Sequence, residues 1–274
     1  MTSARAGATS DSQILKRREP MRKTLWIVVG LTILAWCGAG CAHQKKVSAQ
    51  DQKSAQAYYL LAVAYLNGGD ATSALEELLK AEKLNPYDSE IQNSLGLVYY
   101  AKEKYGAAIG HLERAIQLDP KNSDAHHNLG TIYLYQGRHD QAIAEFESAL
   151  ANDLYRNRAQ SLNSLGYTYY KKRDFLKAEK YLLDCLEHDH MYLLAYDNLA
   201  KVYISLERYD DAKVQLERVL KLKEFYPEAM LDLGLVYLNT GQKAKAKELF
   251  QKVLRIDPLG QYGQRAQEYL GLLE

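Results

Sequence analysis

Side chains able to catalyse a reaction or to hold a metal ion are few and scattered in this 274-residue chain. The histidines cluster at two places, His126 with His127 and His188 with His190. A zinc site needs three or four converging ligands at characteristic spacing, and neither pair has them. The chain has neither a glycine-rich phosphate loop nor the strained Gly-X-Ser-X-Gly turn of a hydrolase nucleophile. We therefore predict a protein that is not an enzyme and that binds no metal and no other cofactor.

The three cysteines also offer little chemistry. Cys37 and Cys41 stand at the end of an apolar run near the N-terminus, and Cys185 is the only cysteine after them. A disulfide within the chain beyond residue 41 is therefore excluded. We interpret Cys185 as a small buried residue, because alanine holds the equivalent position in other copies of the repeat described below. The alternative is a redox or dimer-linking role.

Residues 21–41, MRKTLWIVVGLTILAWCGAGC, combine two early positive charges with an apolar run. As a helix, the run from Leu25 to Trp36 would reach about 18 Å, which is short of the roughly 30 Å of a bilayer's hydrocarbon core. A short apolar run behind basic residues and ahead of small ones is typical of a secretory signal peptide. We therefore predict that residues 1–40 form a signal region and that Met21 is the true start.

The end of this region, GAGC, resembles a bacterial lipobox, in which the cysteine is acylated and becomes the first residue after cleavage. The resemblance implies acyl chains on Cys41, and Ala42 after it implies sorting to the outer membrane. The expected location is the outer membrane, with the protein lipid-anchored on the periplasmic face. The alternatives are an uncleaved anchor and a conventional signal peptide. We interpret residues 41–54 as the lipidated N-terminus and a polar tether, because they lack apolar periodicity.

The remainder of the chain repeats itself. The residues NSLGLVYY (93–100) return as NSLGYTYY (163–170), and four further segments share the pattern. Each copy has a small marker residue, a tyrosine three positions later and an alanine twelve positions later. The markers are Ala62, Gly96, Gly130, Gly166, Ala200 and Gly234, spaced by 34 residues except for one interval of 36.

Apolar residues in each copy recur every three or four positions over two stretches, which predicts a pair of amphipathic helices. A 34-residue period with this signature resembles the tetratricopeptide repeat, or TPR. The resemblance implies an all-α fold, a right-handed superhelical solenoid of six helix-pair repeats with a concave inner wall. The expected copies are residues 55–88, 89–122, 123–156, 159–192, 193–226 and 227–260, followed by a capping helix at 261–274.

By the same resemblance, side chains of the first helix of each repeat would line the inner wall. The wall would be rich in tyrosine, aliphatic and amide side chains, which suit an extended or amphipathic peptide. The predicted groove residues are Tyr59, Val63, Asn93, Leu97, Tyr100, His127, Tyr135, Asn163, Tyr167 and Tyr170. The alternative is that some of these tyrosines only pack against the adjacent repeat.

One segment narrows the choice of family. Residues 149–187 contain the two extra residues of the long interval and replace the usual closing proline with DLYRNRA. With the six repeats and the lipid signal, this segment resembles the type IV pilus biogenesis lipoproteins, the pilotin family known as PilF, PilW or Tgl. The positions that match are Tyr155, Arg158 and Ala159. The resemblance implies a lipoprotein that helps secretin subunits reach the outer membrane and multimerise there.

Nucleic acid is disfavoured as a partner. The formal net charge is +1, and residues 1–40 hold an excess of Lys and Arg, so the rest of the chain is slightly acidic. A nucleic-acid surface would need a basic stripe. The competing hypotheses are a lipoprotein scaffold for peptidoglycan-synthesis or other envelope complexes, and a TPR protein that regulates an enzyme.

Overall fold

The computed structural model describes residues 47–273, which form thirteen α-helices and no strand. The signal region (residues 1–40) and Cys41 lie outside the described residues. The helices are α3 (Ala49–Asn67), α4 (Ala71–Leu84), α5 (Ser89–Ala101), α6 (Tyr105–Leu118), α7 (Ser123–Tyr135), α8 (His139–Leu150), α9 (Arg158–Lys171), α10 (Phe175–His188), α11 (Leu193–Ser205), α12 (Tyr209–Leu222), α13 (Pro227–Asn239), α14 (Lys243–Ile256) and α15 (Gln261–Gly271).

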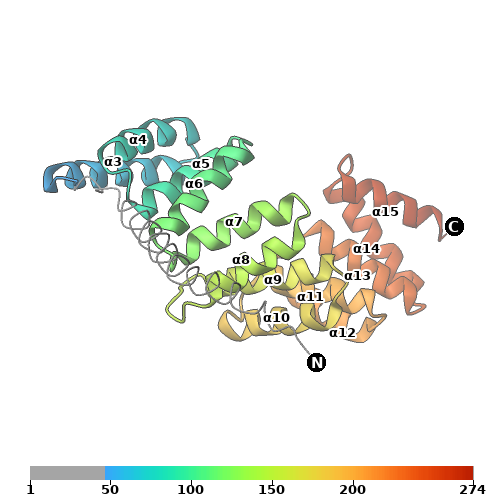
Figure 1. Ribbon diagram of the computed structural model, residues 1–274. Coiled ribbons are helices and arrows are strands. Elements are labelled where there is room, and N and C mark those ends of the chain that lie inside the picture. The colour runs from blue at the N-terminus through green and yellow to red at the C-terminus, as the bar shows by residue number, and fades with distance from the viewer. Residues whose placement is uncertain (1–46, 274) are drawn as a thin grey trace, which may run out of the picture. The chain divides into compact units, whose positions relative to one another are not determined.

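Consecutive helices pack in pairs, from α3 with α4 to α13 with α14, and each pair packs on the next (Figure 1). The predicted all-α solenoid of helix pairs is therefore confirmed. None of the helices in the described part of the chain is long and apolar enough to cross a membrane.

The predicted tether is wrong at its C-terminal end. We expected polar linker up to residue 54, but α3 begins at Ala49. Residues 49–54 are AQDQKS, mostly good helix formers, with Asp51 in the first turn where a carboxylate stabilises the helix dipole. The apolar pattern could not reveal this turn, because the first buried side chain of α3 is Ala55.

The turn inside each pair places one residue in the left-handed region of backbone conformation. The six residues are Gly69, Glu103, Gly137, Arg173, Glu207 and Gly241, with φ between 58° and 79°. Glycine adopts this conformation at no steric cost, whereas other residues are strained there. Asp70 then caps α4, its carboxylate accepting hydrogen bonds from the amides of Thr72 and Ser73.

The two helices of a pair approach closely at the marker residue. A Cβ added to Gly96 would lie 2.5 Å from Leu112 Cγ, and one added to Gly234 would lie 2.4 Å from Phe250 Cε1. The large side chain on the second helix therefore occupies the space that the glycine leaves free. Ala108, the alanine twelve residues after Gly96, is fully buried in the same contact.

Cys185 belongs to this core, as predicted. It is fully buried, its Sγ lies 3.1 Å from the carbonyl oxygen of Ala159, and burial raises the pKa of the thiol to about 12. A thiol with so high a pKa forms little of the reactive thiolate at neutral pH.

The segment that departs from the 34-residue period is the connection between α8 and α9. Tyr155 is buried there, and burial raises the pKa of its phenol. Arg158 opens α9 and donates a hydrogen bond to the carbonyl oxygen of Leu150, at 2.9 Å. The two extra residues are thus accommodated by a turn that is held to the end of α8.

Candidate protein-binding surfaces

Aromatic side chains gather at the turn end of repeats two and three. The ring centroids of Tyr100 and Tyr105 are 5.9 Å apart, and those of Tyr105 and Tyr135 are 5.2 Å apart. Tyr135 remains 65% exposed, and its hydrogen bond with Tyr105 raises the pKa of the Tyr105 phenol to about 12. These three rings form the first aromatic cluster, which offers broad apolar area with polar tips.

The second aromatic cluster lies in repeat four and consists of Tyr167, Tyr170 and Phe175. The centroid of the Tyr170 ring is 6.1 Å from that of Tyr167 and 6.0 Å from that of Phe175. The Nζ of Lys171 lies 5.4 Å from the Tyr167 ring centroid, in cation–π range. The structure thus brings four predicted groove residues, Tyr100, Tyr135, Tyr167 and Tyr170, into two clusters.

Tyr105 and Phe175 were not predicted as groove residues. Each is the first residue of the second helix of its repeat, whereas we considered only first helices. The aligned copies contain a signal, because a ring recurs at this position in Tyr105, His139, Phe175 and Tyr209.

Three predicted groove residues, Asn93, His127 and Asn163, are wrong. Each is at least nine-tenths buried and bonds to a neighbouring repeat instead of facing a partner. The amide nitrogen of Asn128 donates to Asn93 Oδ1, and that of Asn198 donates to Asn163 Oδ1, both at 2.9 Å.

His127 also bonds to a neighbouring repeat. Its Nδ1 lies 2.8 Å from Ser161 Oγ, and burial lowers the pKa of its imidazole to about 4, so the ring is neutral at physiological pH. Buried polar groups need such partners, and these contacts fix how successive repeats stack.

The remaining predicted groove residues, Tyr59, Val63 and Leu97, are half-buried on α3 and α5. Burial, followed by the nearby Glu90 carboxylate, raises the pKa of Tyr59. The three side chains are partly open to a partner, and their role stays a prediction.

The first helix carries an apolar surface that the sequence pattern did not reveal. Leu61 is 44% exposed, although the leucine at the same position of the next five repeats is at most 5% exposed. In those repeats the preceding helix pair covers this position, and no described residue precedes α3 in that way. On the same side of α3 as Leu61, at helical spacing, the exposed apolar side chains are Tyr58 and Tyr65. We call these three residues the α3 apolar face.

This face was missed because periodicity treats the first copy like the others. The feature that distinguishes it is that no helix precedes α3 among residues 47–273. The opposite end differs, since α15 packs on α14 and buries Ala266 and Leu270. Uncovered apolar side chains at one end of a solenoid are a candidate docking surface.

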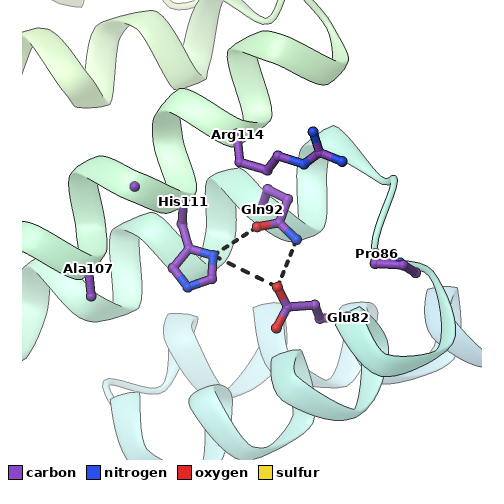
Figure 2. A pocket seen from close by; sticks show the side chains of 7 residues that line it. Glu82, Pro86, Gln92, Ala107, His111 and Arg114 are labelled. Carbon is purple, nitrogen blue, oxygen red and sulfur yellow. Dashed lines mark hydrogen bonds and ion pairs between the residues drawn. The ribbon is translucent and has the colours of Figure 1, made fainter. Parts of the chain in front are cut away.

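A pocket of about 470 Å³ lies between α4, α5 and α6. Figure 2 shows His111 and Glu82 both directed at the amide of Gln92. The His111 ring donates from Nδ1 to Gln92 Oε1 at 2.8 Å, and Gln92 Nε2 donates to Glu82 Oε1 at 2.9 Å. Burial lowers the pKa of His111, against the opposing effect of Glu82.

Gln92 forms the central hydrogen bonds of this pocket. It stands four residues before Gly96, where the TPR signature has tryptophan, and a smaller side chain leaves space. The polar groups in the pocket satisfy one another. No group of three or more potential metal ligands occurs among residues 47–273.

Repeats five and six contain a buried cluster of charges. Lys201 Nζ lies 2.6 Å from Asp197 Oδ2 and 2.7 Å from Glu228 Oε1. Asp232 is 8% exposed, and burial raises the pKa of its carboxyl to about 6. Asp197 is 2% exposed, and its Oδ1 has no hydrogen-bond partner.

Comparisons with known proteins agree with this architecture. Three TPR family profiles match the chain: one described as TPR repeat over residues 96–137, and two described as tetratricopeptide repeat, over 122–189 and over 45–89 with 198–260. Among curated proteins, the Hsp70-Hsp90 organising protein of Plasmodium falciparum is 25% identical over 103 residues, which are 38% of this chain and 41% of that protein. The chain thus spans less than half of that relative.

Two of the solved structures that match cover about four-fifths of this chain. The structure of PilF from Pseudomonas aeruginosa has a TM-score of 0.73 at 18% identity, covering 80% of this chain and 99% of that one. The structure of PilW, described as a widely conserved type IV pilus biogenesis factor, has a TM-score of 0.73 at 20% identity, covering 78% and 98%. The resemblance stated from the sequence is confirmed at the level of the fold. The helix pairs, their period and the profile matches together show that the chain belongs to the tetratricopeptide repeat family.

Proposed function

We propose that this protein is a non-enzymatic outer-membrane lipoprotein that binds secretin subunits and promotes their multimerisation for type IV pilus assembly. The observation that carries the proposal is the α3 apolar face, an exposed surface on the helix that follows Cys41 most closely in sequence. Likeness in fold to PilF and PilW, over almost their whole length, supports the choice of a pilus partner.

The proposed mechanism needs binding and no bond chemistry. Acyl chains on Cys41 hold the repeats at the membrane surface, since residues 42–48 reach at most about 25 Å when extended. A membrane protein subunit exposes apolar segments before it inserts, and the α3 apolar face covers such a segment. The aromatic clusters hold a neighbouring stretch of the same subunit. Anchoring raises the local concentration of the two proteins without adding a contact.

A deletion strain tests the partner. We expect heat-resistant secretin multimers to be lost when the gene is removed and to return when the full chain is supplied. A Cys41→Ser chain, which cannot be acylated, should restore few multimers. Normal multimers in the deletion strain would rule out this partner and favour the envelope-scaffold alternative.

Replacing single leucines with glutamate tests whether the α3 apolar face is the docking surface. Leu61→Glu places a carboxylate in the α3 apolar face, so multimers should fall while the repeats stay folded. Leu259→Glu is the matched control, because Leu259 is 89% exposed and lies before α15, away from that face in sequence. Equal loss, or equal recovery, with both variants would show that the α3 apolar face is not the docking surface.

A further inference from the structure

A second pocket lies between repeats four and five and has a different chemistry. It has a volume of about 450 Å³ and is lined by Tyr170, Lys171, Arg173, Phe175 and Ser205. These residues come from the end of α9, the turn after it, the start of α10 and the end of α11. Two rings of the second aromatic cluster therefore share a pocket with two cationic side chains.

The two cations are available to a ligand. Lys171 rests over the Tyr167 ring, and neither Lys171 nor Arg173 forms an ion pair with any residue between 47 and 273. The neighbouring charges are already matched, since Lys172 pairs with Asp140 and Lys177 with Asp174. Both cations are exposed, so a partner's carboxylate could reach them.

The fold does not require these cations. At the position of Lys171, the other copies have Asn67, Ala101, Tyr135, Ser205 and Asn239. At the position of Arg173, they have Gly69, Glu103, Gly137, Glu207 and Gly241. Arg173 also has φ of 61°, where a side chain is strained and glycine is not. Only repeat four combines a lysine and an arginine, although glycine suits the turn better.

We propose that this pocket binds an acidic side chain that lies next to an aromatic residue in an extended segment of a protein partner. The partner's ring packs on Tyr170 and Phe175, in the offset or tilted arrangement that aromatic pairs prefer. Its carboxylate binds Lys171 and Arg173 through charge-assisted hydrogen bonds.

The inference deepens the proposed function, since it rests on the second aromatic cluster being part of a partner surface. It does not depend on the partner being a secretin. A binding measurement with synthetic peptides therefore separates the two proposals.

The test uses the purified full chain and two fluorescein-labelled peptides that differ in one residue. In one peptide Phe is directly followed by Asp, and in the other it is directly followed by Asn. The remaining residues of both peptides are Gly and Ser. By fluorescence anisotropy, the Phe-Asp peptide should bind at least about tenfold more tightly than the Phe-Asn peptide at low ionic strength. Because exposed charges are screened by salt, the difference should shrink at high salt.

Variants of the chain assign the effect to this pocket. Arg173→Gly removes one cation, and it should fold at least as well as the natural chain because glycine occupies this turn in three other repeats. It should lose most of the preference for Asp. The double variant K171E/R173E should abolish the preference. K121E/R156E, which reverses an exposed lysine and an exposed arginine in other loops, should keep it.

Equal affinity for the two peptides would overturn the inference, as would an unchanged Asp preference in K171E/R173E. Loss of the preference in K121E/R156E to the same extent would show a general charge effect and would also contradict it. Secretin multimers that disappear with Leu61→Glu but persist with K171E/R173E would leave the proposed function standing. That result, with equal affinity for the two peptides, would reject only this pocket.

Discussion

At the scale of single residues, each repeat depends on small side chains that let its two helices pack closely. Ala108 is fully buried in the contact between α5 and α6, so Ala108→Leu should overpack it and lower the free energy of unfolding by about 1–3 kcal/mol. Its neighbour Ala107 is exposed on the same helix, and Ala107→Leu should leave stability nearly unchanged. Thermal unfolding followed by circular dichroism compares the two. Equal melting temperatures would contradict the packing described for α6.

Residue-level prediction from the sequence succeeded where a side chain's environment recurs. Leu95 and Leu112 follow the helical period and are fully buried. Prediction failed for Asn93 and Asn163, because a polar residue at an inner-wall position either faces a partner or bonds to the next repeat. Periodicity does not distinguish these outcomes, whereas the amide at the partner position, Asn128 or Asn198, does.

At the scale of elements, the contact between α11 and α13, the first helices of repeats five and six, differs in its polar side chains from the equivalent contacts between earlier repeats. Asn93 with Asn128, and Asn163 with Asn198, are hydrogen-bonded pairs separated by 35 residues. Asp197 and Asp232 have the same separation, so two buried carboxyls stand where other repeats pair two amides. Charged groups on three helices also affect the pKa of Asp232: Lys201 and Asp197 on α11, Glu228 on α13 and Arg265 on α15.

The buried pair Asp197 and Asp232 should make the stability of the chain depend on pH. The pKa of Asp232 is about 6 in the folded chain against a usual 3.8, so between these values the folded state binds more protons than the unfolded state. The free energy of unfolding should therefore fall as the pH rises from about 4 to about 6, by as much as about 3 kcal/mol for this group.

Asp232→Asn should remove that fall and stabilise the chain at neutral pH. The amide that replaces the Asp232 carboxyl can donate to Asp197 Oδ1, and it carries no charge that burial would penalise. Asp153→Asn, at an exposed residue in the connection between α8 and α9, is the control and should leave the pH profile unchanged. Urea unfolding of the three chains across this pH range measures the effect. A destabilised Asp232→Asn chain at pH 7 would contradict the assignment.

At the scale of the whole molecule, the two ends of the repeat array differ. The ring of Tyr269 in α15 lies 5.2 Å from that of Phe250, and Tyr262 donates a hydrogen bond to Glu228. A chain that ends at residue 260 should therefore unfold at lower temperature, with a loss of at least about 2 kcal/mol from the apolar area exposed. A chain that ends at residue 271, after α15, should melt like the natural chain. Equal melting of both would contradict a capping role for α15.

The order of helices and their pairing were predictable, because each repeat encodes its own helix pair and neighbouring pairs stack in sequence order. The start of α3 and its uncovered face were not. Both concern the place where the repeat pattern ends, and a periodic signal carries no information about what lies beyond its first copy. The α3 apolar face is a property of the structure, in which Leu61 is exposed whereas its equivalent Leu95 is buried.

The central claim is that the α3 apolar face contacts a secretin subunit. Placing a photoreactive amino acid at position 61 in the full chain, and illuminating intact cells, tests it most directly. We predict crosslinks from position 61 to a secretin subunit and none from position 259. Crosslinks from position 61 that reach only lipid or another protein, while secretin multimers form normally, would contradict the account.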